Sequence, residues 1–531
     1  MYSLKSKRMK KDRVDAACFV LEQLSNEAMP SFKKLSSLKL EASEQFGLPD
    51  MISNSELIAA ASAAQRKRLS ALLRKAPVRS LSGVSVIAIM AKPSGCVGKC
   101  IYCPGGTKSP KSYTGQEPAA RRAEQMHFDA FKQVRHRVTQ LKEIGHNPRK
   151  CELIVMGGTF NALPLGYQRN FVKRAFDGFN VALSTSLAQA QKKNEHASRR
   201  VVGITFETRP DYATPERISR LVDFGATRIE LGVQTLSDQV YKKVRRGHCV
   251  QDVVDATQTC KNAFLKVCYH YMPGLFCTPE EDVRMMRQLF EDPRFKPDLL
   301  KIYPCLVLKG TPLYRMWKRG EFTPYSTEEA AEVIAEAKRF FPPWVRVMRV
   351  DRDIPVNLVE AGVDKSNLRE IVAKKLAEKG GRCRCIRCRE AGLQARTGKA
   401  VDWKQVELKR VDYDASNGKE VFLSFEDSSN DLLLGFLRLR TPSENPFRKE
   451  LEGCAGVREL HVYGEQLAIG THDALAVQHK DLGKRLLIEA ERIAFEEWHA
   501  RRVAVISGVG VRDYYRKQGY RLDGAYVAKK L

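Results

Sequence analysis

Short apolar runs alternate with longer amphipathic stretches through the middle of the chain, between residues 80 and 310. Most of the runs are rich in β-branched residues, which is typical of buried parallel strands. The six runs are 84–90, 152–156, 201–206, 228–233, 266–271 and 299–303. Strands that alternate with helices predict an α/β fold, here a partial (β/α)6 barrel, in which functional residues collect at the carboxyl ends of the strands.

Polar or glycine-rich motifs follow these strands, as that rule requires. After the first five runs come a cysteine loop at 96–103, Gly157 and Gly158, Glu207, Gln234, and 272–274. Glycines at such a point allow the backbone to approach a ligand closely, although they could also merely turn the chain. Glu207 is a candidate for a ribose or substrate contact, and a structural ion pair with Arg209 is the alternative.

The pattern changes on both sides of the predicted barrel. Residues 1–75 are basic and helical, with an apolar stripe of Val14, Ala17, Cys18, Leu21 and Leu24. Beyond residue 400, the runs 421–425 and 432–439 predict antiparallel strands, and 502–506 predicts another. A basic turn opens an amphipathic helix within 478–492, which predicts an anion site at the helix N-terminus. We therefore divide the chain into a basic helical region (1–75), a barrel (76–360), a linker (361–400) and an α+β domain (401–531).

The charge balance indicates the class of partner. The chain has 531 residues, with 90 Lys and Arg against 62 Asp and Glu, and a net charge of +28. Basic clusters at 5–13, 66–79, 346–352 and 382–389 suit a polyanion, so we expect a nucleic acid partner. The N-terminal region is expected to bind RNA, with a solubilising tail as the alternative. No run reaches the length of a membrane span, so we expect a cytoplasmic protein without a membrane partner.

Three cysteines in a loop rich in glycine and proline suggest a metal cluster. Cys96, Cys100 and Cys103 form a C-x3-C-x2-C pattern, one thiolate short of the four that hold an ordinary 4Fe-4S cluster. The open iron can bind the amino and carboxylate groups of S-adenosylmethionine (SAM) and cleave it to a 5′-deoxyadenosyl radical. A zinc loop would want a fourth Cys or His, and none follows within the next 20 residues. The spacing resembles that of radical SAM enzymes, whose corresponding glycine pair, here Gly157 and Gly158, meets the amino group of SAM.

A second group, Cys383, Cys385 and Cys388, forms a C-x-C-x2-C pattern on a basic loop. Thiolates this close favour zinc, and neighbouring arginines would help to keep them deprotonated. The fourth ligand is not evident, and a reduced loop without metal is the alternative. The cysteines predicted to lie in the core are Cys18, Cys151, Cys260, Cys268 and Cys277.

The C-terminal region resembles GNAT acetyltransferases, which bind the pyrophosphate of coenzyme A at such a turn. From about residue 76 onward, the whole chain resembles the Elongator catalytic-subunit family in its archaeal stand-alone form. The motifs that carry this resemblance include Cys-Ile-Tyr-Cys-Pro-Gly-Gly, Met-Gly-Gly-Thr-Phe, Glu-Thr-Arg-Pro-Asp-Tyr, Arg-Glu-Leu-His-Val-Tyr-Gly and Ile-Ser-Gly-Val-Gly. The resemblance implies carboxymethylation of C5 of the wobble uridine in the tRNA anticodon loop. In the archaeal stand-alone form the enzyme requires no further Elongator subunits, and a homodimer is one possible oligomeric state.

The resemblance also implies cofactors and residues. It assigns a 4Fe-4S cluster to Cys96, Cys100 and Cys103, and gives Lys150 and Tyr515 catalytic roles. The acetyl-CoA contacts that it implies are Lys150, Glu459, Leu460, His461, Val462, Leu482, Gly483, Lys484 and Tyr515. Asp481 stands where the family usually has glycine, and its carboxylate should lower coenzyme affinity.

In the implied mechanism the deoxyadenosyl radical takes a hydrogen from the acetyl methyl group, and the carbon radical adds to C5 of uridine. Hydrolysis of the thioester then leaves the carboxymethyl group. Two alternative functions come from other classes of protein. One is a protein lysine acetyltransferase with a structural iron–sulfur domain, and the other is a non-catalytic RNA-binding scaffold. The net charge and the SAM-site motifs argue against the first, and the complete cysteine motif argues against the second.

Overall fold

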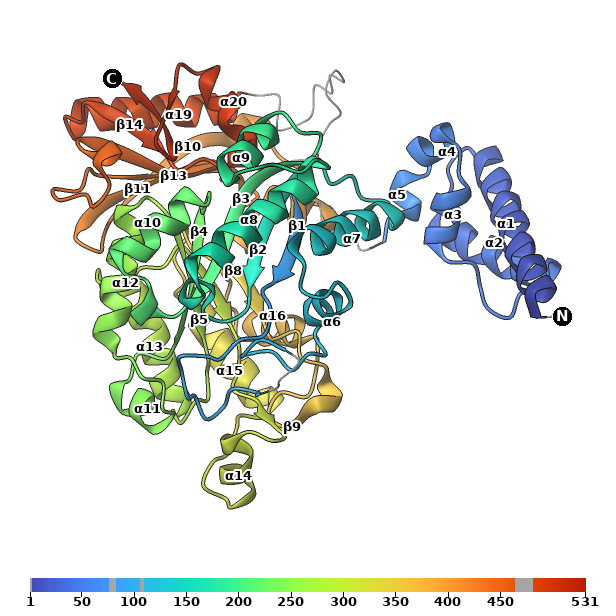
Figure 1. The fold of residues 1–531 in the computed structure, drawn as a ribbon, viewed down its shortest axis with the longest axis horizontal. Coiled ribbons are helices and arrows are strands. Elements are labelled where there is room, and N and C mark those ends of the chain that lie inside the picture. The colour runs from blue at the N-terminus through green and yellow to red at the C-terminus, as the bar shows by residue number, and fades with distance from the viewer. Residues whose placement is uncertain (1, 76–82, 106–108, 464–480) are drawn as a thin grey trace. The chain divides into compact units, whose positions relative to one another are not determined.

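The computed structural model describes residues 2–75, 83–105, 109–463 and 481–531. The chain forms two compact units, which are described separately (Figure 1). One comprises the residues up to Ser85 together with 135–149, and the other comprises 86–134 and 150–531. Residues 478–480, which belong to the predicted coenzyme turn, lie outside the described residues. Within the described part, no helix is both long and apolar enough to cross a membrane.

The first unit is helical, as the sequence predicted. Its helices are α1 (Tyr2–Asn26), α2 (Phe32–Gln45), α3 (Asn54–Ala60), α4 (Ala63–Arg68) and α5 (Ser70–Leu73). The predicted stripe was partly wrong, because Val14 and Cys18 are exposed and Ala16 and Val20 are buried instead. Arg13 donates to the carboxylate of Glu56, which also closes the capping box at the start of α3.

A curled sheet of seven strands forms the first half of the second unit. Its order is β1-β2-β3-β4-β5-β6-β8, and the five pairings from β2 to β8 are parallel. The strands are β1 (Ser85–Met90), β2 (Lys150–Met156), β3 (Arg200–Thr208), β4 (Arg228–Gln234), β5 (Lys266–Tyr271), β6 (Leu299–Ile302) and β8 (Arg346–Val350). The six predicted strands are therefore confirmed. The seventh, β8, comes from a segment that the sequence marked only as a basic cluster.

Helices cover the convex face of this half-barrel (Figure 1). The helices of this half are α6 (Pro118–Gln125), α8 (Leu165–Asn180), α9 (Leu187–Glu195), α10 (Pro215–Asp223), α11 (Asp238–Lys243), α12 (Val250–Asn262), α13 (Pro279–Glu291), α14 (Pro312–Lys318), α15 (Thr327–Lys338) and α16 (Leu368–Glu378). The helix α7 (Ala130–Glu143) belongs to the first unit from residue 135 onward. A small ribbon of β7 (Val307–Leu308) and β9 (Val359–Ala361) completes it. Side chains alternate along the strands, so apolar residues pack under the helices and the other set faces the concave side.

A second, mixed sheet follows, with the order β10-β11-β12-β13-β14-β16-β15. Its strands are β10 (Val406–Ala415), β11 (Gly418–Asp427), β12 (Leu432–Arg440), β13 (Cys454–Val462), β14 (Arg502–Val505), β15 (Arg521–Asp523) and β16 (Tyr526–Lys530). The helices here are α17 (Ile386–Arg389), α18 (Ala391–Gln394), α19 (Leu482–Arg492) and α20 (Arg512–Arg516). The predicted antiparallel pair is confirmed as β11 and β12, and α19 packs on the sheet through Leu486, Leu487 and Ala490.

The register of β12 and β13 contains a bulge that shapes this domain. Arg438 pairs with Glu459 but Leu439 pairs with Val457, so Arg458 is an extra residue. The parallel pairing of β13 with β14 ends at the same place, at Val457. Among the described residues, the last part of β13 therefore pairs with β12 alone, and no other described strand pairs with its second edge.

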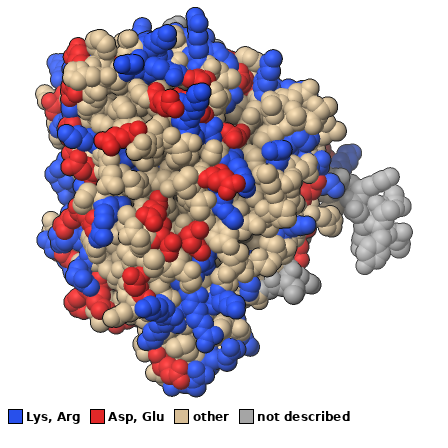
Figure 2. Space-filling view, turned by 60° about the vertical axis from the view of Figure 1, so that its left-hand side comes forward, with Lys and Arg blue, Asp and Glu red and all other residues tan. Residues whose placement is uncertain are grey.

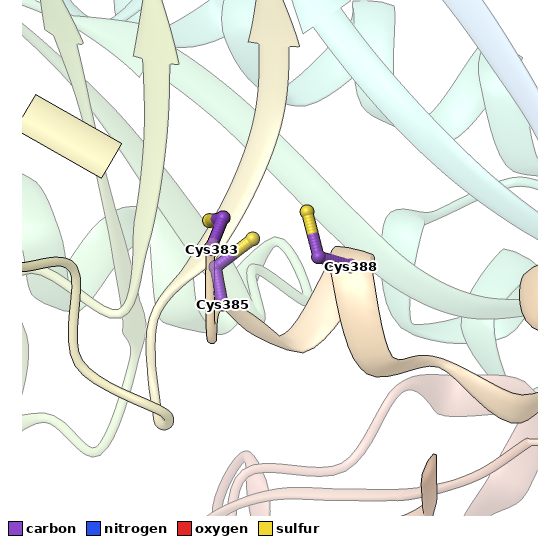
Figure 3. Close-up of side chains that lie close together, drawn as sticks. All are labelled: Cys383, Cys385 and Cys388. Carbon is purple, nitrogen blue, oxygen red and sulfur yellow. The ribbon is translucent and has the colours of Figure 1, made fainter. Parts of the chain in front are cut away.

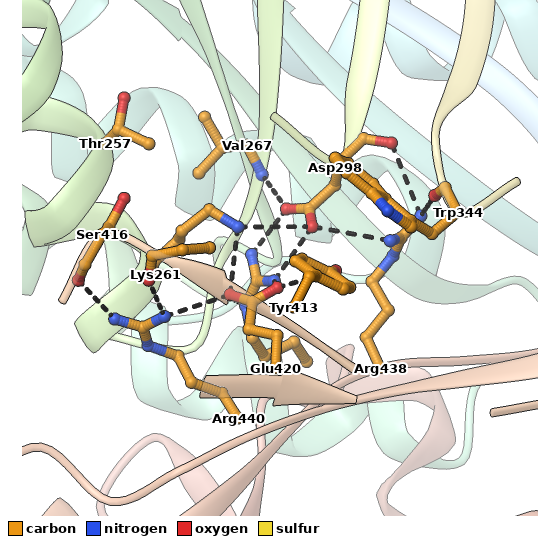
Figure 4. A network of polar contacts seen from close by, with 12 residues as sticks. Thr257, Lys261, Val267, Asp298, Trp344, Tyr413, Ser416, Glu420, Arg438 and Arg440 are labelled. Carbon is orange, nitrogen blue, oxygen red and sulfur yellow. Dashed lines mark hydrogen bonds and ion pairs between the residues drawn. The ribbon is translucent and has the colours of Figure 1, made fainter. Parts of the chain in front are cut away.

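Buried ion pairs join the second sheet to the amino-terminal ends of the barrel strands (Figure 4). Arg458 donates to both oxygens of Asp298, at 2.9 and 2.5 Å, and to Glu420 at 2.8 Å. Lys261 lies 3.0 Å from Glu420, and Arg438 lies 3.6 Å from Asp298. The side chains of these five residues are completely buried. Because the nearby cations stabilise its charged form, the pKa of Asp298 is held far below its usual range.

We predict that Arg458→Met lowers the free energy of unfolding by about 3–5 kcal/mol, because two buried carboxylates lose their shared partner. Urea unfolding measures this change. The matched control is Arg410→Met, since Arg410 pairs with Asp412 and Glu497 at a one-third exposed position and should lose less than about 1 kcal/mol. Equal losses in the two variants would contradict the role assigned to Arg458.

Candidate cluster and coenzyme sites

The three cysteines of the first motif lie in the loop after β1, at the carboxyl-terminal mouth of the half-barrel. Each sulfur accepts an N–H donor. The backbone of Gly98 donates to Cys96 at 3.3 Å, and that of Ser112 donates to Cys103 at 3.2 Å. The guanidinium of Arg246 donates to Cys100 at 3.4 Å. Burial raises the pKa of the Cys103 thiol, and the donors oppose this effect. N–H donors to sulfur are a common surrounding of the thiolates that hold iron–sulfur clusters.

Two glycines border the same mouth. Gly157 and Gly158 follow β2 with φ of 132° and 79°, a region that favours glycine. A side chain on Gly157 would also lie 3.4 Å from Ala91. Both positions therefore suit a close approach of the backbone to a ligand.

Glu207, at the end of β3, accepts a hydrogen bond from the hydroxyl of Tyr113 at 2.7 Å. The alternative ion pair with Arg209 is not formed, because Arg209 pairs with Asp211 at 2.9 Å. Burial, followed by the neighbouring Glu207 carboxylate, raises the pKa of Tyr113 well above its ordinary value. Tyr113 therefore stays protonated and holds Glu207 at this mouth.

A cavity of about 720 Å³ opens beside the cysteine loop. Its lining is rich in cations: Lys99, Arg209, Lys242, Arg245 and Arg246. One nitrogen of Arg209 is buried there without a hydrogen-bond partner in the described residues. This cavity suits an anionic group.

The second cysteine group is brought together as the sequence predicted (Figure 3). The sulfurs of Cys383, Cys385 and Cys388 all lie within 4.8 Å of one another. Hydrogen bonds from the neighbouring thiols hold the pKa of Cys385 well below its ordinary value. Three sulfurs at this spacing can hold one zinc ion, and the described residues contribute no fourth Cys, His, Asp or Glu ligand to the group.

Among the residues expected to contact acetyl-CoA, Glu459 to Val462 form the end of β13, and Gly483 of α19 lies beside Val462. Glu459 and His461 face the barrel, whereas Leu460 and Val462 pack against the core under α19. Burial lowers the pKa of His461, and its Nε2 atom is buried without a partner in the described residues. An unpaired strand edge can bind an extended chain that contains amides, as the arm of coenzyme A does.

The start of α19 supplies the adjoining anion site. Its first backbone N–H groups, from Leu482 to Lys484, point out of the helix end, where no intrahelical acceptor exists. Asp481 precedes them in a left-handed conformation, with φ of 53°. This conformation explains why glycine suits the position and shows that the aspartate is tolerated there.

Tyr515 and Lys150 complete the group from two different domains. The ring of Tyr515 packs against Tyr514 and Tyr520, and no described residue bonds to its hydroxyl. Lys150 opens β2 next to Arg200 in the ladder, and burial lowers its pKa. The turn at Gly508 and Gly510 packs against the first residues of β3, so the domain of the second sheet lies against this end of the barrel sheet.

The structure thus separates the predicted residues into two groups at opposite mouths of the half-barrel. Lys150 begins β2 and Gly157 follows its end, so a strand of about 20 Å lies between the two groups. Sequence reasoning missed the polar face that connects them. The sequence does contain a sign of this polar face, namely charged residues or histidine within the apolar strands. These residues are Arg228, Glu230, Lys266, His270 and Lys301.

Comparison with known proteins agrees with this architecture. Family models match the ELP3 N-terminal domain at residues 15–81, the radical SAM superfamily at 92–290 and the radical SAM C-terminal domain at 297–378. The tRNA uridine(34) acetyltransferase of Methanocaldococcus infernus is 50% identical over 490 residues, which cover 90% of this chain and 91% of that protein. The chain belongs to the Elongator complex protein 3 family.

Other family members are similar over almost the same length. Human Elongator complex protein 3 is 43% identical over 510 residues, covering 94% of this chain and 93% of that protein. The solved structure of Methanocaldococcus infernus Elp3 with an N-terminal deletion matches this one with a TM-score of 0.76 at 46% sequence identity. The match covers 85% of this chain and 100% of the chain in that structure.

We predict that Asp481→Gly raises coenzyme A affinity about fivefold or more, because it removes a negative charge beside the pyrophosphate. Calorimetric titration with coenzyme A measures the effect. Asp481→Asn is the matched control, since it removes the charge but keeps the side chain. If neither variant binds more tightly, the pyrophosphate does not lie at this helix end.

Proposed function

We propose that this member of the Elongator complex protein 3 family carboxymethylates C5 of the wobble uridine in tRNA, using SAM and acetyl-CoA. Relatives named tRNA uridine(34) acetyltransferase are about 50% identical over most of the chain. The observation that carries the proposal is a half-barrel with a cysteine loop at one mouth and a free strand edge of a second domain at the other. The same proposal divides the chain into an RNA-binding region (1–75), a radical SAM domain (76–360), a zinc-binding linker (361–400) and a GNAT domain (401–531).

At the first mouth, Cys96, Cys100 and Cys103 would hold the 4Fe-4S cluster. Gly157 and Gly158 would receive the methionine end of SAM. Bound together, these cofactors supply a 5′-deoxyadenosyl radical that can abstract hydrogen from carbon. The donors from Gly98, Ser112 and Arg246 orient the thiolates and support their charge.

At the second mouth, the backbone from Leu482 to Lys484 would bind the pyrophosphate of acetyl-CoA. The free edge of β13, from Glu459 to Val462, would bind the amides of its arm. Tyr515 would donate its hydroxyl near the thioester, and Lys150 would contribute a positive charge from the barrel. Both domains therefore bind one coenzyme molecule.

The tRNA would be bound by basic surfaces near the first mouth. The backbone of Leu313 in α14 donates to Ile101 of the cysteine loop, so this helix borders the loop. Its exposed cations include Arg315, Lys318 and the adjoining Arg319. Figure 2 shows Lys and Arg gathered at the lower end of one face, at the height of α14 in Figure 1. The anticodon loop suits this site because its bases can be presented unstacked.

The zinc ion proposed at Cys383, Cys385 and Cys388 would have a structural role. Ile386 donates to the carbonyl of Val345 before β8, and Glu390 pairs with Leu433 of the second sheet. The loop thus contacts both domains, and zinc there would hold the two together.

We predict two independent metals. Anaerobically reconstituted protein should contain about four irons, and Cys100→Ala should lose iron and SAM cleavage while it keeps zinc. Cys388→Ala should lose zinc while it keeps iron. Elemental analysis measures both metals, and unchanged iron in Cys100→Ala would refute the cluster assignment.

We further predict that the acetyl methyl group is the source of the transferred carbon. With acetyl-CoA deuterated at the methyl group, deuterium should appear in 5′-deoxyadenosine during anaerobic reaction with SAM and tRNA. Normal formation of carboxymethyluridine without that label would contradict the mechanism.

Lys150→Ala and Tyr515→Phe should lower the yield of carboxymethyluridine about tenfold with iron content intact, because each removes a hydrogen bond or charge at the coenzyme. Mass spectrometry of tRNA nucleosides measures the yield. The exposed Lys517, changed to alanine, is the matched control and should behave as the wild type.

A further inference from the structure

A polar cluster lies on the concave face of the half-barrel, outside both groups of predicted site residues. Arg228 and Glu230 come from β4, His270 from β5 and Lys301 from β6. In the parallel ladder His270 pairs with Lys301, and Glu230 pairs with Cys268. The cluster therefore lies halfway between the two mouths, on the face that connects them.

Glu230 is the centre of this cluster. Its carboxylate lies 2.9 Å from Nε2 of His270 and 3.3 Å from Nε of Arg228, and it also accepts from Lys301. The residue is 1% exposed. The surrounding positive charge, first that of Lys301, keeps its pKa well below the usual range despite burial. Glu230 is therefore a fixed negative charge in the wall of the half-barrel.

The cluster does not suit a metal ion, although Glu230, Cys268 and His270 lie within 4.8 Å of one another. The ammonium of Lys301 already contacts the carboxylate that a cation would need. Burial also raises the pKa of the Cys268 thiol far above its ordinary value, so no thiolate is available. What remains is a histidine held by a buried carboxylate.

His270 is oriented for proton transfer. Nε2 lies 2.9 Å from the Glu230 carboxylate, which can only accept, so Nε2–H is the donor, and no described residue bonds to Nδ1. The ring packs edge-on against Tyr303, with 5.3 Å between centroids, and its side chain is 15% exposed. A carboxylate that fixes one ring nitrogen while the other faces the reactants is the arrangement of a general base.

The position of His270 also matches one step of the reaction. This inference rests on the proposed function, in which a thioester must be hydrolysed after its methyl carbon joins uridine. The thioester carbonyl is bonded to that carbon, so after the carbon has joined uridine the thioester has left Tyr515 and lies near the mouth where the radical forms. His270 is the second-last residue of β5 and so lies toward that mouth. His461, by contrast, lies near Lys266 at the start of the same strand. Four residues of extended chain, about 13 Å, separate Lys266 from His270.

We propose that His270 is the general base that hydrolyses the thioester, and that Glu230 positions it. Nδ1 takes a proton from water as the water oxygen attacks the thioester carbonyl carbon. The carbon–sulfur bond then breaks, and the same proton passes from His270 to the leaving sulfur of coenzyme A. The products are the carboxymethyl group and free coenzyme A, and no electron is gained or lost.

The test uses an anticodon stem–loop RNA that carries 5-carboxymethyluridine as its coenzyme A thioester. The holoenzyme without reductant should release coenzyme A, which a thiol reagent detects. His270→Gln should slow this release about 100-fold or more, the usual loss for a general base. Glutamine keeps a donor for Glu230, and His270→Asn serves if the first variant fails to fold. His196→Gln, at a histidine whose side chain is 70% exposed, is the matched control.

In the complete reaction, His270→Gln should form 5′-deoxyadenosine at the wild-type rate and accumulate tRNA linked to coenzyme A. Unchanged release of coenzyme A in the variant would overturn the assignment. So would a parallel loss of 5′-deoxyadenosine, because it would mean a structural role. Failure of the proposed function itself is distinguishable, since the wild type would then form no carboxymethyluridine whatever the hydrolysis assay gives.

Discussion

The buried contact between Arg458 and Asp298 is the constraint on which the rest of the second unit depends. Arg458 reaches Asp298 because a bulge inserts it as an extra residue in β13. The bulge also places Glu459 on the barrel side, where it lies 3.7 Å from Lys266. The pairing of β13 with β14 ends at Val457, directly before Arg458, so the described residues leave the edge of β13 unpaired beyond that point. One irregularity thus both attaches the second domain and opens the proposed coenzyme site.

The attachment determines how the two proposed reactions are connected. The second domain closes the amino-terminal mouth, and the cysteine loop occupies the other, so whatever passes between them crosses the concave face. Charged groups such as Arg228 and Glu230 would be unfavourable in a purely structural core, because burying each ion costs several kcal/mol. Their mutual ion pairs offset part of that cost. The proposed reaction against this face would give these charges a role that the structural pair of Arg458 and Asp298 does not have.

The sequence predicted the parts of the molecule that depend on local pattern. Six barrel strands were visible as apolar runs, and the second cysteine group was brought together as its spacing predicted. It did not predict β8, because Arg346 and Arg349 made the segment resemble a basic surface. Nor could it predict that Glu230 meets His270, or that Glu459 lies beside Lys266. These relations depend on strand register and on the bulge at Arg458, and neither leaves a periodic signal in the chain.

The rigidity of the attachment limits how the acetyl group could travel between the mouths. A hinge opening of the second domain would expose the ion pairs of Arg438, Arg458 and Lys261, and each broken buried pair costs about 3–5 kcal/mol. Motion of the flexible coenzyme arm breaks none of them. On the proposed mechanism the arm is therefore the element that would move, and the acetyl group would enter the half-barrel from its amino-terminal end. It would then lie against the wall that carries Glu230 and His270 when it meets the radical.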